Sequence, residues 1–127
     1  MFQDSAEASS QEYAESIIDT VREPLIVLDA KLRVISASRS FYRVFQATPE
    51  NTVGRPLYEL GNRQWDIPQL RQLLESILPK NTAFESYEME HDFPDVGHRK
   101  LLLNGRRIVG KGAVTKLILL AMEEVKD

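Results

Sequence analysis

The chain has 127 residues, a formal net charge of −3 at pH 7 and no cysteine. This length suits one domain with one hydrophobic core, and a content of 43% hydrophobic and 28% charged residues is that of a globular protein. The lack of cysteine excludes disulfides, thiolate catalysis and sulfur-based zinc sites. The weakly acidic charge gives no electrostatic reason to expect nucleic acid or an anionic membrane as a partner.

No segment of the sequence has the features of a membrane or export signal. The longest uninterrupted apolar run, Leu117–Met122, is far shorter than the roughly 20 residues of a membrane-spanning helix. The first ten residues are polar and acidic and lack the apolar core of a signal peptide. We therefore expect a cytoplasmic domain without membrane contact of its own, although a parent protein can be anchored elsewhere.

The N-terminal quarter predicts a flexible segment followed by a helix. Residues 1–9 are small and polar, and a capping box of Ser9 and Glu12 opens a flanking helix over residues 10–23. One face of this helix is apolar, which makes it a candidate dimer interface, and this face can pack on its own sheet or on a second chain. Its members are Tyr13, Ile17, Ile18 and Val21.

Two short apolar runs, Leu25–Leu28 and 33–37, then predict a β-hairpin. Ser38 is placed to cap a short helix, and Thr48 followed by Pro49 is a second helix start. Residues 54–66 are predicted to be irregular.

The second half predicts one long helix and three strands. A capping box of Asp66 and Gln69 opens the helix, whose apolar residues keep helical spacing over 67–78 until Pro79. Residues 87–93, 101–108 and 115–122 then follow strand patterns, with a loop at 109–112. The order of elements predicts an α+β fold over residues 24–125: a five-stranded antiparallel sheet with helices on one face and an N-terminal flanking helix.

This order resembles that of the PAS domain, and local patterns are similar as well. Glu23–Asp29 resembles the first PAS strand with its terminal aspartate, and Val34–Ser38 followed by Phe41 and Phe45 is similar to the second strand and first core helix. The likeness covers about residues 11–125. A PAS domain implies a sensor or docking module, with flanking helices that often form a homodimer.

Two stretches, 64–68 and 102–107, resemble PAS modules of bacterial sensor histidine kinases and related chemotaxis proteins. The sequence departs from the family pattern at Ser38, where such modules often have Asn, and at 124–126, where Asp-Ile-Thr is usual. The chain stops just after the last predicted strand, as an input domain excised ahead of a kinase or other output domain would. We therefore expect the parent to be a histidine kinase, a transferase, whose catalysis lies outside this chain.

The motifs that suggest other chemistry have simpler explanations. Gly105–Gly112 nearly matches a phosphate-binding loop, but Gly112 replaces the hydroxyl residue that holds magnesium. The two histidines, His91 and His98, lack the convergent partners of a metal site. The resemblance implies that haem would need a histidine in residues 67–78 and that photoactive flavin would need a cysteine, and neither is present. We expect no catalytic residue, metal, haem or photoactive flavin, and leave open an unidentified small molecule.

The chamber between sheet and helices is the remaining candidate site. Its residues would line a ligand pocket, or would be ordinary core, which is the simpler explanation for each of them. Trp65 would either wall a pocket or plug it, and Arg63, Tyr87 and Asn104 would orient a ligand. The candidate lining residues are Phe41, Phe45, Leu57, Arg63, Trp65, Leu70, Leu74, Tyr87, Met89, Leu101, Leu103, Asn104 and Leu119.

These features predict a regulatory sensor module, the input domain of a two-component sensor histidine kinase, that binds a small ligand or mediates dimerisation. One alternative is a ligand-free interaction or dimerisation module of a chemotaxis or transcription-regulatory protein. Another is a small lipid- or metabolite-binding enzyme on a similar α+β frame.

Overall fold

The computed structural model describes residues 17, 18 and 20–125. Residues 17, 18 and 20 are helical. Most of the flanking helix predicted over 10–23, with the flexible segment predicted over 1–9, lies outside the described residues.

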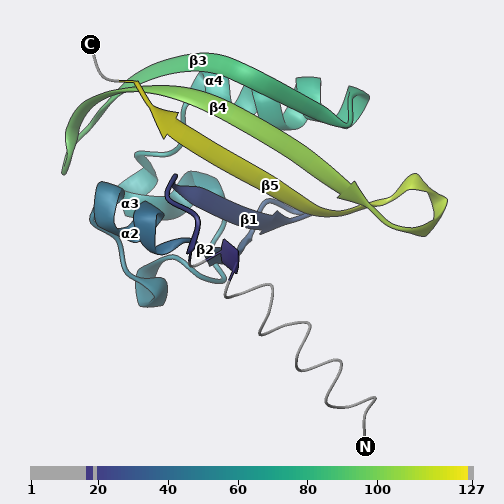
Figure 1. Ribbon diagram of the computed structural model, residues 1–127, viewed down its shortest axis with the longest axis horizontal. Helices are drawn as coiled ribbons and strands as arrows, with labels where there is room; N and C mark the ends of the chain where they lie inside the picture. The colour runs from purple at the N-terminus through teal and green to yellow at the C-terminus, as the bar shows by residue number, and fades with distance from the viewer. Residues whose placement is uncertain (1–16, 19, 126–127) are drawn as a thin grey trace, which may run out of the picture.

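Five strands and a series of short helices make up the described chain (Figure 1). The strands are β1 (Leu25–Asp29), β2 (Val34–Ala37), β3 (Ala83–Phe93), β4 (Gly97–Val109) and β5 (Thr115–Glu124). The α-helices are α2 (Arg39–Phe45), α3 (Leu60–Arg63) and α4 (Pro68–Gln72). The 3₁₀ and π turns are η1 (Pro49–Asn51), η2 (Leu57–Glu59), η3 (Leu73–Ile77), η4 (Leu78–Lys80) and η5 (Lys111–Ala113). In the described part of the chain no helix is long and apolar enough to cross a bilayer.

The strands form one antiparallel sheet in the order β2-β1-β5-β4-β3, which confirms the predicted fold class. The last strand is central, because β5 pairs with both β1 and β4. This position explains why its sequence, Leu117–Met122, is apolar at every position: both of its faces are at least partly covered.

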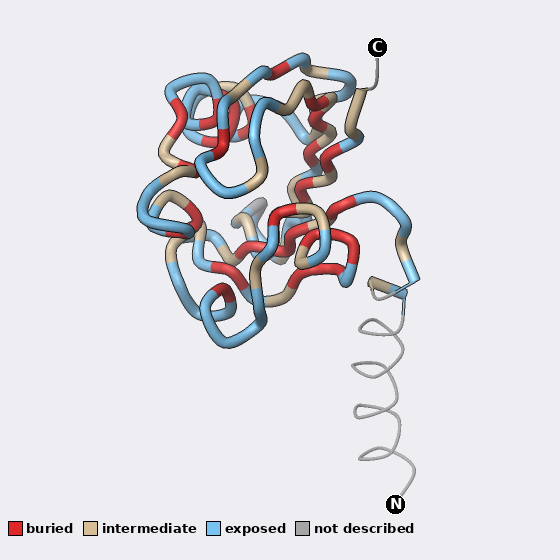
Figure 2. The backbone as a smooth tube through the Cα atoms, turned by 90° about the vertical axis from the view of Figure 1, so that its left-hand side faces the viewer, coloured by how far each residue is buried: buried red, intermediate tan, exposed pale blue. Residues whose placement is uncertain are grey.

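The core lies between one face of this sheet and the helices that connect β2 to β3. Along β5 the buried residues are Ile118, Leu120 and Met122, while the residues between them are half-buried. The same alternation places Leu101 and Leu103 of β4 on this inner face. Figure 2 shows these buried positions recurring along the strands and on the helical segments that face them.

Ser38 is the predicted cap of α2, and the structure confirms it. Its Oγ accepts hydrogen bonds from the backbone N–H groups of Phe41, at 3.2 Å, and Leu25, at 3.0 Å. The hydroxyl also lies 3.3 Å from the carbonyl oxygen of Glu23, to which it donates. Because Ser38 is fully buried, these bonds satisfy a hydroxyl group and two amides that water cannot reach.

The long helix predicted over 67–78 consists of α4, η3 and η4, and it differs from its prediction at both ends. The capping box of Asp66 and Gln69 is wrong: Ile67 is the N-cap residue and makes no side-chain capping bond. Asp66 instead accepts two bonds from Arg71, from Nε at 2.6 Å and from Nη2 at 3.2 Å. Pro79 does not stop the helix at 78, because it fits the first turn of η4, where no N–H is needed. Residues 54–66 are also less irregular than predicted, since they contain η2 and α3.

Strand β3 begins at Ala83, four residues earlier than the alternating pattern indicates. Its register shifts between Phe84 and Tyr87, and Ser86 at this bulge has a φ of 53°. The extra residue of the bulge interrupts the alternation of apolar and polar side chains along β3. The alternation is therefore visible in the sequence only after the bulge.

Candidate functional site

Four aromatic rings fill the chamber between sheet and helices. Trp65 lies with its ring centroid 4.8 Å from Phe45, 4.9 Å from Phe93 and 5.7 Å from Phe41. Each of the four side chains is at most 4% exposed. Their tilted and edge-on geometries are those of favourable aromatic contacts. Trp65 therefore fills the chamber beside these rings, and it also lines the polar cavity next to them.

Phe93 belongs to this aromatic cluster, although it is not among the predicted pocket residues. Phe93 ends β3 and lies on the same face as Met89, as its even spacing from that residue indicates. Its neighbour on the same face, His91, packs edge-on against it with ring centroids 4.9 Å apart.

Most of the predicted pocket residues are core residues. Tyr87 is half-buried and packs against this core. Nine of the thirteen are buried, namely Phe41, Phe45, Leu57, Trp65, Leu70, Leu74, Met89, Leu101 and Leu103.

Three predicted pocket residues do not face the chamber. The Arg63 side chain is 67% exposed, and its Nη1 lies 3.8 Å from Oδ2 of Asp66. Asn104 and Leu119 lie on the opposite face of the sheet, because their strand neighbours Leu103 and Leu120 point into the core. The expectation that they line the chamber is wrong, since successive residues of a strand face opposite ways.

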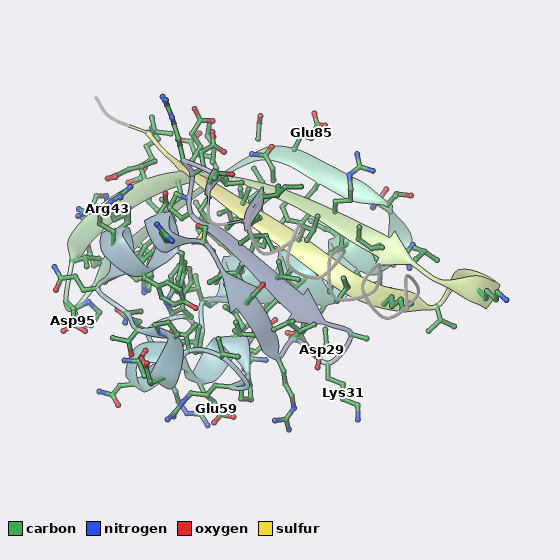
Figure 3. The ribbon with its side chains drawn as sticks, turned by 60° about the horizontal axis from the view of Figure 1, so that its bottom comes forward. Asp29, Lys31, Arg43, Glu59, Glu85 and Asp95 are labelled. Atoms are coloured by element: carbon green, nitrogen blue, oxygen red, sulfur yellow. The ribbon has the colours of Figure 1, made fainter. Side chains whose placement is uncertain are left out.

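A polar cavity of about 310 Å³ lies beside the aromatic cluster. Its apolar wall is the edge of that cluster, together with Leu60. Thr52, only 1% exposed, stands in the polar wall and donates a 3.1 Å bond to Oδ1 of Asn51. In Figure 3 two further lining residues, Glu59 and Asp95, lie on the side of the helices, while Glu85 lies across the molecule on β3. A cavity of this size is at the small end of ligand pockets and suits a small polar molecule.

The outer face of the sheet carries a second apolar surface. The register aligns Leu119 with Val27 on β1 and aligns Ala121 with Leu25 and Asn104. Asn104 is held there by its Oδ1, which accepts a 2.9 Å bond from the Ser86 backbone N–H at the β3 bulge. We call this surface the outer-face patch, and its half-buried apolar residues are Leu25, Leu102, Leu117, Leu119 and Ala121, with Ile108 at 39% exposure.

Glycine is required at one position of β4, where β4 pairs with β3. Gly105 pairs with Phe84, whose ring lies over the glycine, and a Cβ at this position would overlap the ring. The same Gly105 opens the stretch that nearly matches a phosphate-binding loop. In the structure it lies inside β4, and the glycines that follow it form the β4–β5 turn.

A network of charged groups fastens η2 to the long helix. Tyr58 donates a 2.9 Å bond from its hydroxyl to Oε2 of Glu75, and the Arg71 guanidinium lies 4.0 Å from the Tyr58 ring centroid. Arg71 also lies 3.4 Å from Glu75. Burial and the bond to Glu75 raise the pKa of Tyr58 above its usual range. Arg71 offsets the negative charge of Glu75, because the two side chains form an ion pair.

A histidine is held between two carboxylates at the β3–β4 hairpin. Nδ1 of His98 lies 2.6 Å from Oδ1 of Asp92, and Nε2 lies 2.9 Å from Oε2 of Glu90. Only the protonated ring donates from both nitrogens, so Asp92 and then Glu90 raise the pKa of His98 above 6.5. The carboxylates contact different nitrogens and do not converge on one point, and no cluster of three metal-ligating side chains occurs among the described residues.

This cluster predicts a pH-dependent contribution to stability. Since the pKa of His98 is raised in the folded chain, its stabilising effect is full below the unfolded value and is lost as pH rises through the folded value. We expect the difference in free energy of unfolding between the wild type and His98→Gln to shrink from about pH 5.5 to about pH 8.5. Urea titrations of both proteins at each pH measure it. An unchanged difference, or an NMR-titrated pKa of His98 below 6.5, would contradict the assignment.

Comparison with known proteins identifies the fold. The sequence profile of the PAS fold matches residues 12–125. Among curated proteins, none matches the sequence. The PAS domain of a protein from Colwellia psychrerythraea is similar, with a TM-score of 0.74 and 14% identity over 91% of this chain and 96% of that one.

Two further solved structures have a similar fold. The PAS domain of an HTR-like protein from Haloarcula marismortui has a TM-score of 0.67 and 12% identity, covering 97% of this chain and 98% of that one. A Vibrio cholerae VqmA dimer structure has a TM-score of 0.70 and 10% identity, covering 88% of this chain and 50% of that one. The profile match, the antiparallel sheet and the helices on its inner face together establish that the chain belongs to the PAS fold family.

Proposed function

We propose that this PAS domain is the regulatory input module of a bacterial sensor histidine kinase and that it works as a homodimer in the cytoplasm. The observation that carries the proposal is the contrast between the two faces of its sheet. The inner face is largely covered by the aromatic cluster and the helices. The outer-face patch has half-buried, partly accessible leucines in the centre of the sheet, on β5 and its neighbours.

The described end of the flanking helix supports a second copy as the occupant of this surface. Ile17 is 49% exposed, while Ile18 and Val21 are half-buried. Exposed apolar side chains are stabilised when a partner covers them, and self-complementary surfaces produce two-fold dimers. The VqmA structure of similar fold is described as a dimer, which is consistent with this proposal.

The kinase assignment rests on the two stretches that resemble histidine kinase modules. Residues 64–68 contain Trp65, which closes the chamber, and 102–107 contain Gly105, which lets Phe84 lie against the sheet. In the proposed mechanism the dimer has two arrangements, and a signal favours one of them by binding it more tightly. The output domain that responds belongs to the parent protein.

Phosphate transfer in the full-length parent tests the proposal. We expect the full-length protein to take up phosphate from labelled ATP in an acid-labile, base-stable form, as phosphohistidine. Ile17→Asp in the same protein should change the rate of labelling, because it puts a charge into the proposed dimer contact. A parent that takes up no label, or one whose labelling Ile17→Asp leaves unaltered, would exclude an input role of this kind.

The closed chamber favours a second candidate function, a ligand-free interaction module of a chemotaxis or transcription-regulatory protein. Trp65, Phe45 and Phe93 occupy the space that a ligand in the chamber would need. This candidate shares the dimer but not the kinase output. It predicts a dimer in a parent that shows no histidine phosphorylation.

A further inference from the structure

A groove opens at the end of the chamber farthest from the aromatic cluster. The cluster lies toward the β3–β4 turn, where Phe93 ends its strand, whereas this groove lies toward the β4–β5 turn, beside Thr115. Its volume is about 260 Å³. Its walls are largely aliphatic and include Leu32, Leu74, Leu78 and Ile118.

Arg107 brings a positive charge to this aliphatic groove. It pairs in register with Ile118, which places it on the inner face of the sheet, and it is half-buried. Its Nη1 donates a 3.3 Å bond to Oγ1 of Thr115. Its Nε is buried and has no hydrogen-bond partner. Within the part of the chain that the structure describes, Arg107 forms no ion pair.

The comparison with Arg99 shows that Arg107 is unusual. The Nε of Arg99 is likewise buried without a hydrogen bond, but it lies 3.4 Å from Oε1 of Glu124, so its charge is compensated. The other charged residue of the groove is Glu75, which is already engaged by Tyr58 and Arg71. Arg107 is therefore the uncompensated charge among the described residues that line the groove.

A buried N–H without a hydrogen-bond partner costs free energy, and native structures rarely leave such a group unexplained. A carboxylate in the groove would supply the missing counter-charge by contacting the accessible part of this half-buried side chain, because guanidinium N–H groups match carboxylate oxygens. A single arginine balances one negative charge. The aliphatic walls would bury the non-polar part of the same molecule.

We propose that this groove binds a small amphipathic monocarboxylate, with its carboxylate on Arg107 and its short hydrocarbon chain against Leu32, Leu74, Leu78 and Ile118. A volume of about 260 Å³ is below the usual range for drug-sized ligands, which limits the chain to a short one. Binding of this ligand class follows from the groove itself. Only the effect of the ligand on signalling rests on the proposed sensory function.

Octanoate is a direct probe, and methyl NMR of the whole 127-residue chain is the measurement. Titration with sodium octanoate up to about 10 mM should shift the methyl signals of Leu74 and Ile118 to saturation, together with the Nε–H signal of Arg107. Arg107→Gln should weaken binding by about tenfold or more, the effect of losing one charge-assisted bond. Arg99→Gln is the matched control and should change the octanoate dissociation constant by less than about twofold. Neutral 1-octanol should bind with no dependence on Arg107.

The wild-type spectra keep the test valid if Arg107→Gln does not fold, because the Arg107 Nε–H signal reports the contact directly. Unshifted groove signals at the highest octanoate concentration would overturn the inference, as would equal octanoate affinity of the wild type and a folded Arg107→Gln. Octanoate binding by a chain that stays monomeric, or whose parent is no kinase, would count against the proposed function alone. Absence of binding in a dimeric, kinase-linked chain would count against the groove alone.

Discussion

We expect replacement of Trp65 with alanine to lower the free energy of unfolding by about 3–5 kcal/mol. The side chain is 2% exposed and contacts rings from α2 and β3, so its removal leaves a cavity lined by Phe41, Phe45 and Phe93. The surrounding backbone belongs to three separate elements, and it collapses only partly into such a space. Urea titration followed by circular dichroism measures the loss.

An exposed aliphatic residue provides the control for this experiment. Ile35, on β2, is 45% exposed, and Ile35→Ala should cost less than about 1 kcal/mol, since little area is lost from the core. If Trp65→Ala costs no more than Ile35→Ala, the chamber is not plugged by Trp65 in solution.

The second large effect concerns association. We expect Ile17→Asp to raise the dimer dissociation constant by about tenfold to 100-fold, because an interface does not readily bury an unpaired charge. Val53→Asp is a closely matched control, because Val53 is 45% exposed and Ile17 is 49% exposed. Val53 lies beside η1 and is not a member of the outer-face patch. Analytical ultracentrifugation of the two variants and the wild type measures the constants. Equal weakening by both substitutions would mean that added charge, and not the position of Ile17, causes the effect.

The elements of the antiparallel sheet and the core were predictable because their signals are local and repeated. Ser38 caps α2 as its side chain and position indicate, since a short hydroxyl side chain before an apolar helical pattern has few other partners. Met89 and Phe93 follow the two-residue period of a half-buried strand, which sets the inner face of β3.

The positions of three residues could not be predicted from such local patterns, and each has a physical reason. Leu119 belongs to a strand that is apolar on both faces, so hydrophobicity contains no information about which way it points. Asn104 is held by a hydrogen bond to the backbone of Ser86, which lies at a β-bulge. Ser86 has a φ of 53°, and no residue type in this stretch predicts such a backbone conformation. Asp66 binds Arg71, five residues away, in preference to the backbone of its own helix end, because a paired guanidinium offers stronger bonds.

The cavities were also invisible in the sequence. The groove at Arg107 brings together residues from the β1–β2 turn, the end of the long helix and the two strands of the β4–β5 hairpin. These segments are distant in sequence and meet only because β1 pairs with β5. The sequence around Arg107 gives no sign that its Nε is buried without a hydrogen-bond partner.

The central claim is that the sheet keeps one face for its own core and offers the other to a second copy. Sedimentation velocity of the wild-type chain from about 1 to about 500 µM measures this directly. The account predicts that the sedimenting mass rises from the 14.5 kDa of one chain to twice that value within this range. A mass that stays at 14.5 kDa throughout would contradict it.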